Sequence, residues 1–293
     1  MYESHFRLRE KPFSILPDPS FIYWSKAHVR AYAMLEYAIL NHAGFAVITG
    51  EIGCGKTTLI QHLLSHIADD VIVGLLSDTQ VASDDLIRWV LLAFEQEFDQ
   101  KSDVGAFRDF RDFVDDCYDH GKRVVLIVDE AQNLSVPTLE KLRMLSNINI
   151  GSDNRLQIIL VGQPQLRALL QRPELRQFMQ RVSSEYHIDP LPPQEVKRYI
   201  QHRLIKAGSP VSLFSTKAIE KIAEASHGIP RVINVLCDTA LVYAYAKGAT
   251  CVYSRSIDDV IADRQNYGVF GRQSAAGGER QEKLDNPEHT PGV

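Results

Sequence analysis

The stretch GEIGCGKTT at residues 50–58 contains the residue types that bind phosphate groups. Its glycines let consecutive backbone N–H groups turn toward phosphate oxygens, its lysine neutralises the outer phosphates, and its threonine offers a hydroxyl to Mg²⁺. The spacing G-x-x-x-x-G-K-[ST] is met in full. We therefore predict that a nucleotide binds along Gly50, Glu51, Ile52, Gly53, Cys54, Gly55, Lys56, Thr57 and Thr58, with Lys56 as a catalytic cation and Thr57 as a metal ligand.

A second group of chemically active residues ends the apolar run VVLIVDE at residues 124–130. Asp129 is placed to hold Mg²⁺ through water, and Glu130 is placed to take a proton from an attacking water molecule. Carboxylates at the end of a buried strand are costly unless they have partners. The alternative, a strand that simply ends at the surface, is disfavoured by the phosphate-binding motif upstream.

Two further positions fit the same chemistry. Gln163 ends the run LQIILVGQ, where its amide could orient water or contact the γ-phosphate; the alternative is an ordinary solvated amide. In HGIPR at residues 227–231, Pro230 predicts a helix start and places Arg231 in the first turn. An arginine there opposes the helix dipole, which favours an anionic ligand over a merely solvated side chain.

These residues require a scaffold of buried strands and covering helices. Short apolar runs rich in branched residues alternate with longer amphipathic segments, which predicts an α/β fold with a parallel sheet covered on both faces. The predicted strands cover residues 45–50, 71–77, 123–130, 156–163 and 183–190. From residue 192 onward the pattern is helical only, with segments near 193–207, 215–226, 230–247 and 255–264.

This pattern predicts four regions. They are an aromatic and proline-rich strap (1–24), an α/β domain (25–191), a small helical domain (192–268) and a disordered polar tail (269–293). We expect the strap chiefly to pack, either on the outside of the sheet or beside the nucleotide base, with Tyr23 and His28 near the base. Docking of a partner is the alternative. The aromatic and proline side chains of the strap are Phe6, Pro12, Phe13, Pro17, Pro19 and Phe21.

Composition narrows the protein class. The 293 residues carry a formal net charge of −5, 45% are hydrophobic, and the four cysteines show no paired spacing. No run approaches the ~18 apolar residues that span a bilayer. We therefore expect a cytoplasmic protein without a direct membrane span, with any role at the inner membrane arising through a partner. The charge disfavours a surface that is basic overall, but it leaves a local basic patch open.

Together these motifs resemble the AAA+ ATPases, with Gln163 matching sensor 1 and Arg231 matching sensor 2. More narrowly, FRLREKPFSILPDPSFIYWSKAH, VDEAQNL and IILVGQPQLRALL resemble the general secretion pathway protein A group, which includes ATPases of pilus biogenesis and exopolysaccharide loci. The resemblance covers residues 1 to about 268. It implies a five-stranded P-loop sheet with a helical lid, ATP hydrolysis with Mg²⁺, and a homo-oligomeric ring or filament.

The resemblance also implies an arginine finger donated by a neighbouring subunit. Arg181, directly before the last predicted strand, and Arg176, five residues earlier, are the candidates, and Arg181 is favoured. Group members often continue into a membrane span and a cell-wall-binding module. Since this chain ends in a short polar tail, we expect a cytoplasmic protein recruited by others.

Two functions remain open. The first is an assembly ATPase of a secretion, pilus or exopolysaccharide machine, driven by nucleotide-dependent oligomerisation. The alternative is a DNA-dependent ATPase of the transposition-regulator type, which would need one basic surface. The cations that could form such a surface are Arg167, Arg172, Arg176, Arg181, Lys197, Arg198, Arg203 and Lys206. A nucleotide-bound scaffold without turnover is disfavoured, since Lys56, Asp129 and Glu130 are all present.

Overall fold

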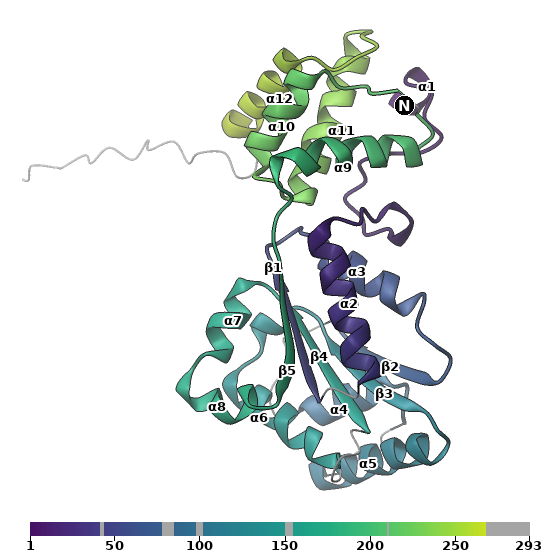
Figure 1. The fold of residues 1–293 in the computed structure, drawn as a ribbon, viewed down its shortest axis with the longest axis vertical. Helices are drawn as coiled ribbons and strands as arrows, with labels where there is room; N and C mark the ends of the chain where they lie inside the picture. The colour runs from purple at the N-terminus through teal and green to yellow at the C-terminus, as the bar shows by residue number, and fades with distance from the viewer. Residues whose placement is uncertain (42–43, 78–84, 98–101, 150–154, 210, 268–293) are drawn as a thin grey trace, which may run out of the picture.

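The computed structural model describes residues 1–267 except 42–43, 78–84, 98–101, 150–154 and 210. In Figure 1 an α/β unit occupies one end of the long axis and a helical unit occupies the other. The N-terminal segment lies with the helical unit, and the chain then enters the α/β unit through α2 (Lys26–Leu40). The predicted tail at 269–293 lies outside the described residues.

The sheet has five strands in the order β2-β3-β4-β1-β5, and each neighbouring pair is parallel. This confirms the predicted fold class. The strands are β1 (Phe45–Gly50), β2 (Val71–Leu76), β3 (Arg123–Val128), β4 (Leu156–Gly162) and β5 (Val182–Ile188). Because β4 lies between β1 and β3, the residues that follow these three strands meet at one edge of the sheet.

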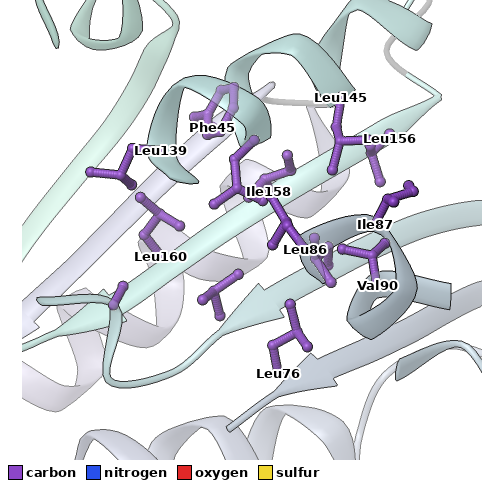
Figure 2. Close-up of a cluster of buried hydrophobic side chains, with 14 of the residues drawn as sticks. Phe45, Leu76, Leu86, Ile87, Val90, Leu139, Leu145, Leu156, Ile158 and Leu160 are labelled. Atoms are coloured by element: carbon purple, nitrogen blue, oxygen red, sulfur yellow. The ribbon is translucent and has the colours of Figure 1, made fainter. Parts of the chain in front are cut away.

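Alternate side chains of the strands feed two hydrophobic clusters, one on each face of the sheet. Phe45 and Val47 join one cluster, whereas Ala46 and Ile48 join the other, as the period of two in a strand requires. Figure 2 shows part of the first cluster, in which Ile158 and Leu160 of β4 lie among helix side chains.

Among the described residues, five helices pack on the first face and two on the second. The first face is covered by α4 (Leu86–Ala93), α5 (Asp103–Asp119), α6 (Val136–Leu145), α7 (Pro164–Leu170) and α8 (Arg176–Met179). The second face is covered by α2 and α3 (Lys56–Leu64). Short 3₁₀ turns lie at Pro19–Phe21, Ala131–Asn133, Ser146–Ile148 and Pro173–Leu175.

The helical unit contains α9 (Pro193–Lys206), α10 (Thr216–Ser226), α11 (Pro230–Ala246) and α12 (Ser254–Tyr267). Its core is a third cluster, separate from the two that cover the sheet. Within the described residues, no helix has the length and apolar character that crossing a bilayer requires.

The strap packs on the helical unit and not on the outside of the sheet, which corrects one of the two placements expected for it. Phe6, Phe13 and Phe21 are buried in the helical cluster, together with the side chain of Tyr2 from the short helix α1 (Tyr2–His5). The Arg9 N–H also donates to the Ala207 carbonyl at 2.8 Å. The second face of the sheet is already covered by α2 and α3, and the end of the strap packs on these helices through Ile22 and Trp24.

Candidate nucleotide-binding site

The phosphate loop connects β1 to α3 through two left-handed glycines. Gly53 has φ +83° and Gly55 has φ +91°, a region that L side chains rarely adopt. Gly55 is the N-cap of α3, so the helix begins at Lys56 with its N-terminus at the loop. The backbone therefore has the curvature and the helix dipole that a phosphate cradle needs.

Lys56 folds back over the loop. Its Nζ donates to the Gly50 carbonyl at 2.8 Å and to the Glu51 carbonyl at 3.1 Å, and its side chain is 7% exposed. Burial lowers the pKa of Lys56 from its ordinary value. Both acceptors are neutral carbonyls, so an anionic phosphate placed near Nζ would be a stronger partner for the ammonium group.

Thr57 and Asp129 meet although 72 residues separate them in sequence. The Thr57 hydroxyl donates to Asp129 Oδ2 at 3.2 Å, and the Asp129 carboxylate is buried just beyond the end of β3. Burial raises the pKa of this carboxyl above its ordinary value. A hydroxyl beside a carboxylate is a set of hard oxygen donors, so these two residues fit Mg²⁺.

Glu130 is held in a closed ring of hydrogen bonds with two glutamines. Its Oε2 accepts from Gln132 Nε2 at 2.6 Å and from Gln163 Nε2 at 3.1 Å, while Gln132 Oε1 accepts the Gln163 N–H at 2.9 Å. Glu130 itself has φ +51°, and this left-handed turn begins the 3₁₀ segment that carries Gln132. Strained backbone of this kind often occurs at functional sites.

The helical unit contacts the phosphate loop through the start of α11. Pro230 is in the first turn of α11, as predicted, and the Arg231 N–H donates to the Gly53 carbonyl at 3.1 Å. A Cβ on Gly53 would lie 2.4 Å from the Arg231 Cβ, so the close approach of α11 requires a glycine at this point. The exposed Arg231 side chain lies at the mouth of the loop.

A pocket lies between the strap, the phosphate loop and the helical unit. Ile15, Leu16 and Pro17 of the strap form one wall, and the predicted residues Lys56, Thr57, Thr58, Glu130, Gln163 and Arg231 also line it. The strap thus lines a pocket together with the phosphate loop, and its place beside the nucleotide base stays a prediction. Tyr23 stacks edge-on with Tyr199 of α9, whereas His28 lies against the phosphate loop.

Arg203 anchors the strap to the helical unit from inside. Its guanidinium is buried over the Phe21 ring, 4.8 Å from the ring centre, and donates to the Pro12 carbonyl and the Tyr199 hydroxyl. Asn234 accepts from the Tyr199 hydroxyl at 2.8 Å and donates to the Ser14 carbonyl at 3.2 Å. These bonds fix the backbone of the strap at the pocket.

The two arginine-finger candidates differ in environment. Arg181 Nη1 donates to the Arg143 carbonyl at 3.0 Å and to the Ser146 hydroxyl, both within this chain, whereas Arg176 is exposed on α8. Neither lies at the pocket of its own chain. Their predicted role in a neighbouring active site stays a prediction.

The basic surface that the DNA-dependent alternative would need stays a prediction, and some of its candidate cations have partners within the chain. Arg203 is buried, and Arg167 lies 3.4 Å from the Glu185 carboxylate. Figure 1 also places α7 and α8 in the α/β unit and α9 in the helical unit, at different ends of the long axis. Since Arg203 is buried, it cannot contribute to such a surface.

Sequence reasoning missed two groups that hold the site. Gln132 is one of them. It follows Glu130 by only two residues, so a tight turn at Glu130 is enough to bring the two side chains together. Arg203 and Asn234 belong to no local motif, since the strap carbonyls to which they donate lie 191 and 220 residues away in sequence. Tyr199 joins the two through its hydroxyl. The residue type alone does not distinguish a buried arginine from an exposed one.

Residues 39–170 match the AAA domain family. The chain is 38% identical over 250 residues to general secretion pathway protein A of Aeromonas hydrophila, an alignment that covers 85% of this chain and 46% of that protein. This chain thus spans about half the length of that relative.

Solved structures share the fold at low identity. The ORC2 protein of Aeropyrum pernix aligns with a TM-score of 0.58 at 17% identity, covering 81% of this chain and 66% of that one. Drosophila ORC bound to DNA aligns with a TM-score of 0.65 at 15% identity, covering 87% and 64%. At these identities the likeness shows the fold alone.

Proposed function

Because this chain belongs to the AAA+ ATPases and is a relative of general secretion pathway protein A, we propose that it binds ATP with Mg²⁺ and hydrolyses the ATP to ADP and phosphate. The observation that carries this proposal is the meeting of three groups at one sheet edge. Lys56, the Thr57–Asp129 pair and the Glu130 ring all line or adjoin the same pocket. A nucleotide scaffold without turnover would not need the carboxylate of Glu130.

Each side chain has a proposed task. Lys56 exchanges its two carbonyl partners for β- and γ-phosphate oxygens, and Arg231 adds a second positive charge from the helical unit. Thr57 and Asp129 hold Mg²⁺, which neutralises charge on the phosphate oxygens when it is bound. Glu130 takes the proton of the attacking water, and Gln163 orients that water or the γ-phosphate beside it.

We propose that the active assembly is a ring or filament of identical subunits, with Arg181 of one copy completing the site of the next. Within the described part of the chain, Arg181 donates to a carbonyl and a hydroxyl, both uncharged, so its positive charge is available to an anion. Arg176 is the second candidate for this arginine finger. Relationship to general secretion pathway protein A supports a role in assembling a secretion, pilus or exopolysaccharide machine, with recruitment from the cytoplasm to the inner membrane by a protein partner.

The test is ATP turnover by the purified chain as a function of its own concentration. We expect the rate per subunit to rise with concentration, and we expect Arg181→Ala to lose about 10³-fold. Glu130→Gln should lose about 10²- to 10⁴-fold because the base is gone.

Mixing the two inactive variants separates a trans mechanism from a cis mechanism. A site that combines Glu130 of one subunit with Arg181 of the other is intact, so partial activity should return. No recovery, or a rate independent of concentration, would contradict the shared site. Strong salt-sensitive stimulation by duplex DNA would instead support the DNA-dependent alternative.

A further inference from the structure

His28, in the first turn of α2, contacts the phosphate loop although it is not part of the motif. Its Nε2 lies 2.9 Å from the Cys54 carbonyl oxygen, and its side chain is 5% exposed. A Cβ on Gly55 would lie 3.0 Å from the same nitrogen, so the imidazole is packed directly against the loop. The contact joins the helix that follows the strap to the centre of the phosphate loop.

The partners of His28 determine where its proton lies. Ser25, the N-cap of α2, accepts the His28 N–H at 3.2 Å, and its hydroxyl lies 2.8 Å from Nδ1. The serine has one proton to donate, and Nδ1 of a neutral imidazole can accept it, which leaves the proton of the ring on Nε2. Burial lowers the pKa of His28, which favours this neutral form. Nε2–H then donates to the Cys54 carbonyl, and every polar atom of the ring has a partner.

Holding the Cys54 carbonyl also orients the next N–H group. In a trans peptide the C=O and the N–H point in opposite directions, so the Gly55 N–H must point away from His28. Cys54 is fixed at two further points, because its N–H donates to the Glu51 carbonyl at 3.1 Å and its side chain is buried in the core. The peptide between Cys54 and Gly55 therefore has little freedom to rotate while His28 is in place.

We propose that His28 is a positioning residue that sets the peptide between Cys54 and Gly55, so that the Gly55 N–H faces the phosphate groups of the bound nucleotide. This inference rests on the proposed nucleotide site and adds to it a residue outside the phosphate loop. Ser25 acts one step further out, since it fixes the tautomer of His28 while capping the helix that carries it.

Two amide substitutions separate positioning from packing. In His28→Gln the amide nitrogen can take the place of Nε2 and donate to Cys54, whereas in His28→Asn the shorter side chain reaches toward Ser25 only. We expect ADP affinity, measured by calorimetry with Mg²⁺, to fall about tenfold in His28→Asn and to stay within about threefold of the unmodified protein in His28→Gln. Thermal unfolding of the two variants should be similar.

The tautomer is tested on the unmodified protein by nitrogen-15 NMR of the imidazole rings, with His28→Gln used to assign the signal. A protonated Nε2 and a bare Nδ1 are expected. A proton on Nδ1 would overturn the proposal, because Nε2 could not then donate to Cys54. Equal ADP affinity in His28→Asn and His28→Gln would also overturn it. Failure of the proposed function is distinguishable, since the unmodified protein would then bind no ADP.

Discussion

The α/β unit and the helical unit contribute to the same pocket by different means. The α/β unit supplies Lys56, Glu130 and Gln163, which follow three adjacent strands and line the pocket, with Asp129 beside them against Thr57. The helical unit supplies the Arg231 backbone N–H and a wall formed by the strap that it holds. In the proposed mechanism the first unit would carry the chemistry and the second would enclose it.

The strap is attached to the helical unit, on the enclosing side of the pocket. It is first in sequence, but the buried Arg203 network binds it to the helical unit. Any rotation of the helical unit would carry the strap wall of the pocket with it, while the phosphate loop would remain on the sheet. Closure around a nucleotide would then bring together surfaces from two bodies, and the following substitutions test each side of that arrangement.

The largest effect is expected at the junction between the two units. Gly228 has φ +74°, and a Cβ there would lie 1.9 Å from the Leu191 carbonyl oxygen. We expect Gly228→Ala to lower the free energy of unfolding by about 3 kcal/mol, from backbone strain together with the clash.

Gly248→Ala is the matched control. Its φ is +65°, but no atom lies within 4 Å of the added Cβ. It should cost only about 1 kcal/mol for the conformation itself. Equal losses in chemical denaturation would show that the Leu191 contact does not constrain the junction.

A smaller effect is expected where the strap is anchored. Arg203→Met keeps an apolar stem but leaves the Pro12 carbonyl without its donor, so we expect a loss of about 2 kcal/mol in unfolding free energy. Release of the strap should also weaken nucleotide binding. Arg198→Met, at an exposed position of the same helix, should stay within about 0.5 kcal/mol. If Arg203→Met lowers neither the unfolding free energy nor the nucleotide affinity, the strap is held by its aromatic side chains and not by Arg203.

The α/β side should respond in the opposite direction. Asp129→Asn removes a buried charge, keeps an oxygen for the Glu130 N–H and offers an amide nitrogen that can donate to the Thr57 hydroxyl. We therefore expect it to stabilise the nucleotide-free protein by about 1 kcal/mol and to abolish Mg²⁺-dependent turnover. Burial raises the pKa of Asp129 in the folded state, so the unmodified fold loses stability as pH rises through that pKa.

The gain from Asp129→Asn should therefore be present at neutral pH and disappear in acid. Thermal unfolding measured at several pH values checks the sign. A gain that grows as pH falls would contradict the assignment of the charge penalty to Asp129.

The smallest effect compares cysteines in the two units. Cys54 is buried in the phosphate loop, and burial raises its pKa to about 11, whereas Cys251 of the helical unit is partly exposed. Alkylation near neutral pH, followed by mass spectrometry, should modify Cys251 first, because access and the thiolate fraction both limit the reaction. Faster labelling of Cys54 would indicate that the loop opens in the nucleotide-free protein.

Local sequence determined a large part of this protein. The G-x-x-x-x-G-K-T spacing predicted a glycine turn between a strand and a helix, the short continuous apolar runs predicted all five strands, and Pro230 marked the start of α11. These features follow from backbone sterics and from burial within a few residues of each position, so they can be predicted from neighbouring letters.

Only the tertiary structure decided which distant groups meet. It packed the strap on the helical unit, buried Arg203 instead of leaving it on a basic surface, placed Gln132 against Gln163, and brought His28 to the Cys54 carbonyl. Each of these contacts joins residues from different elements, through hydrogen bonds or through apolar packing. No periodicity encodes such a contact, because it depends on how whole elements pack and not on the residues beside it in sequence.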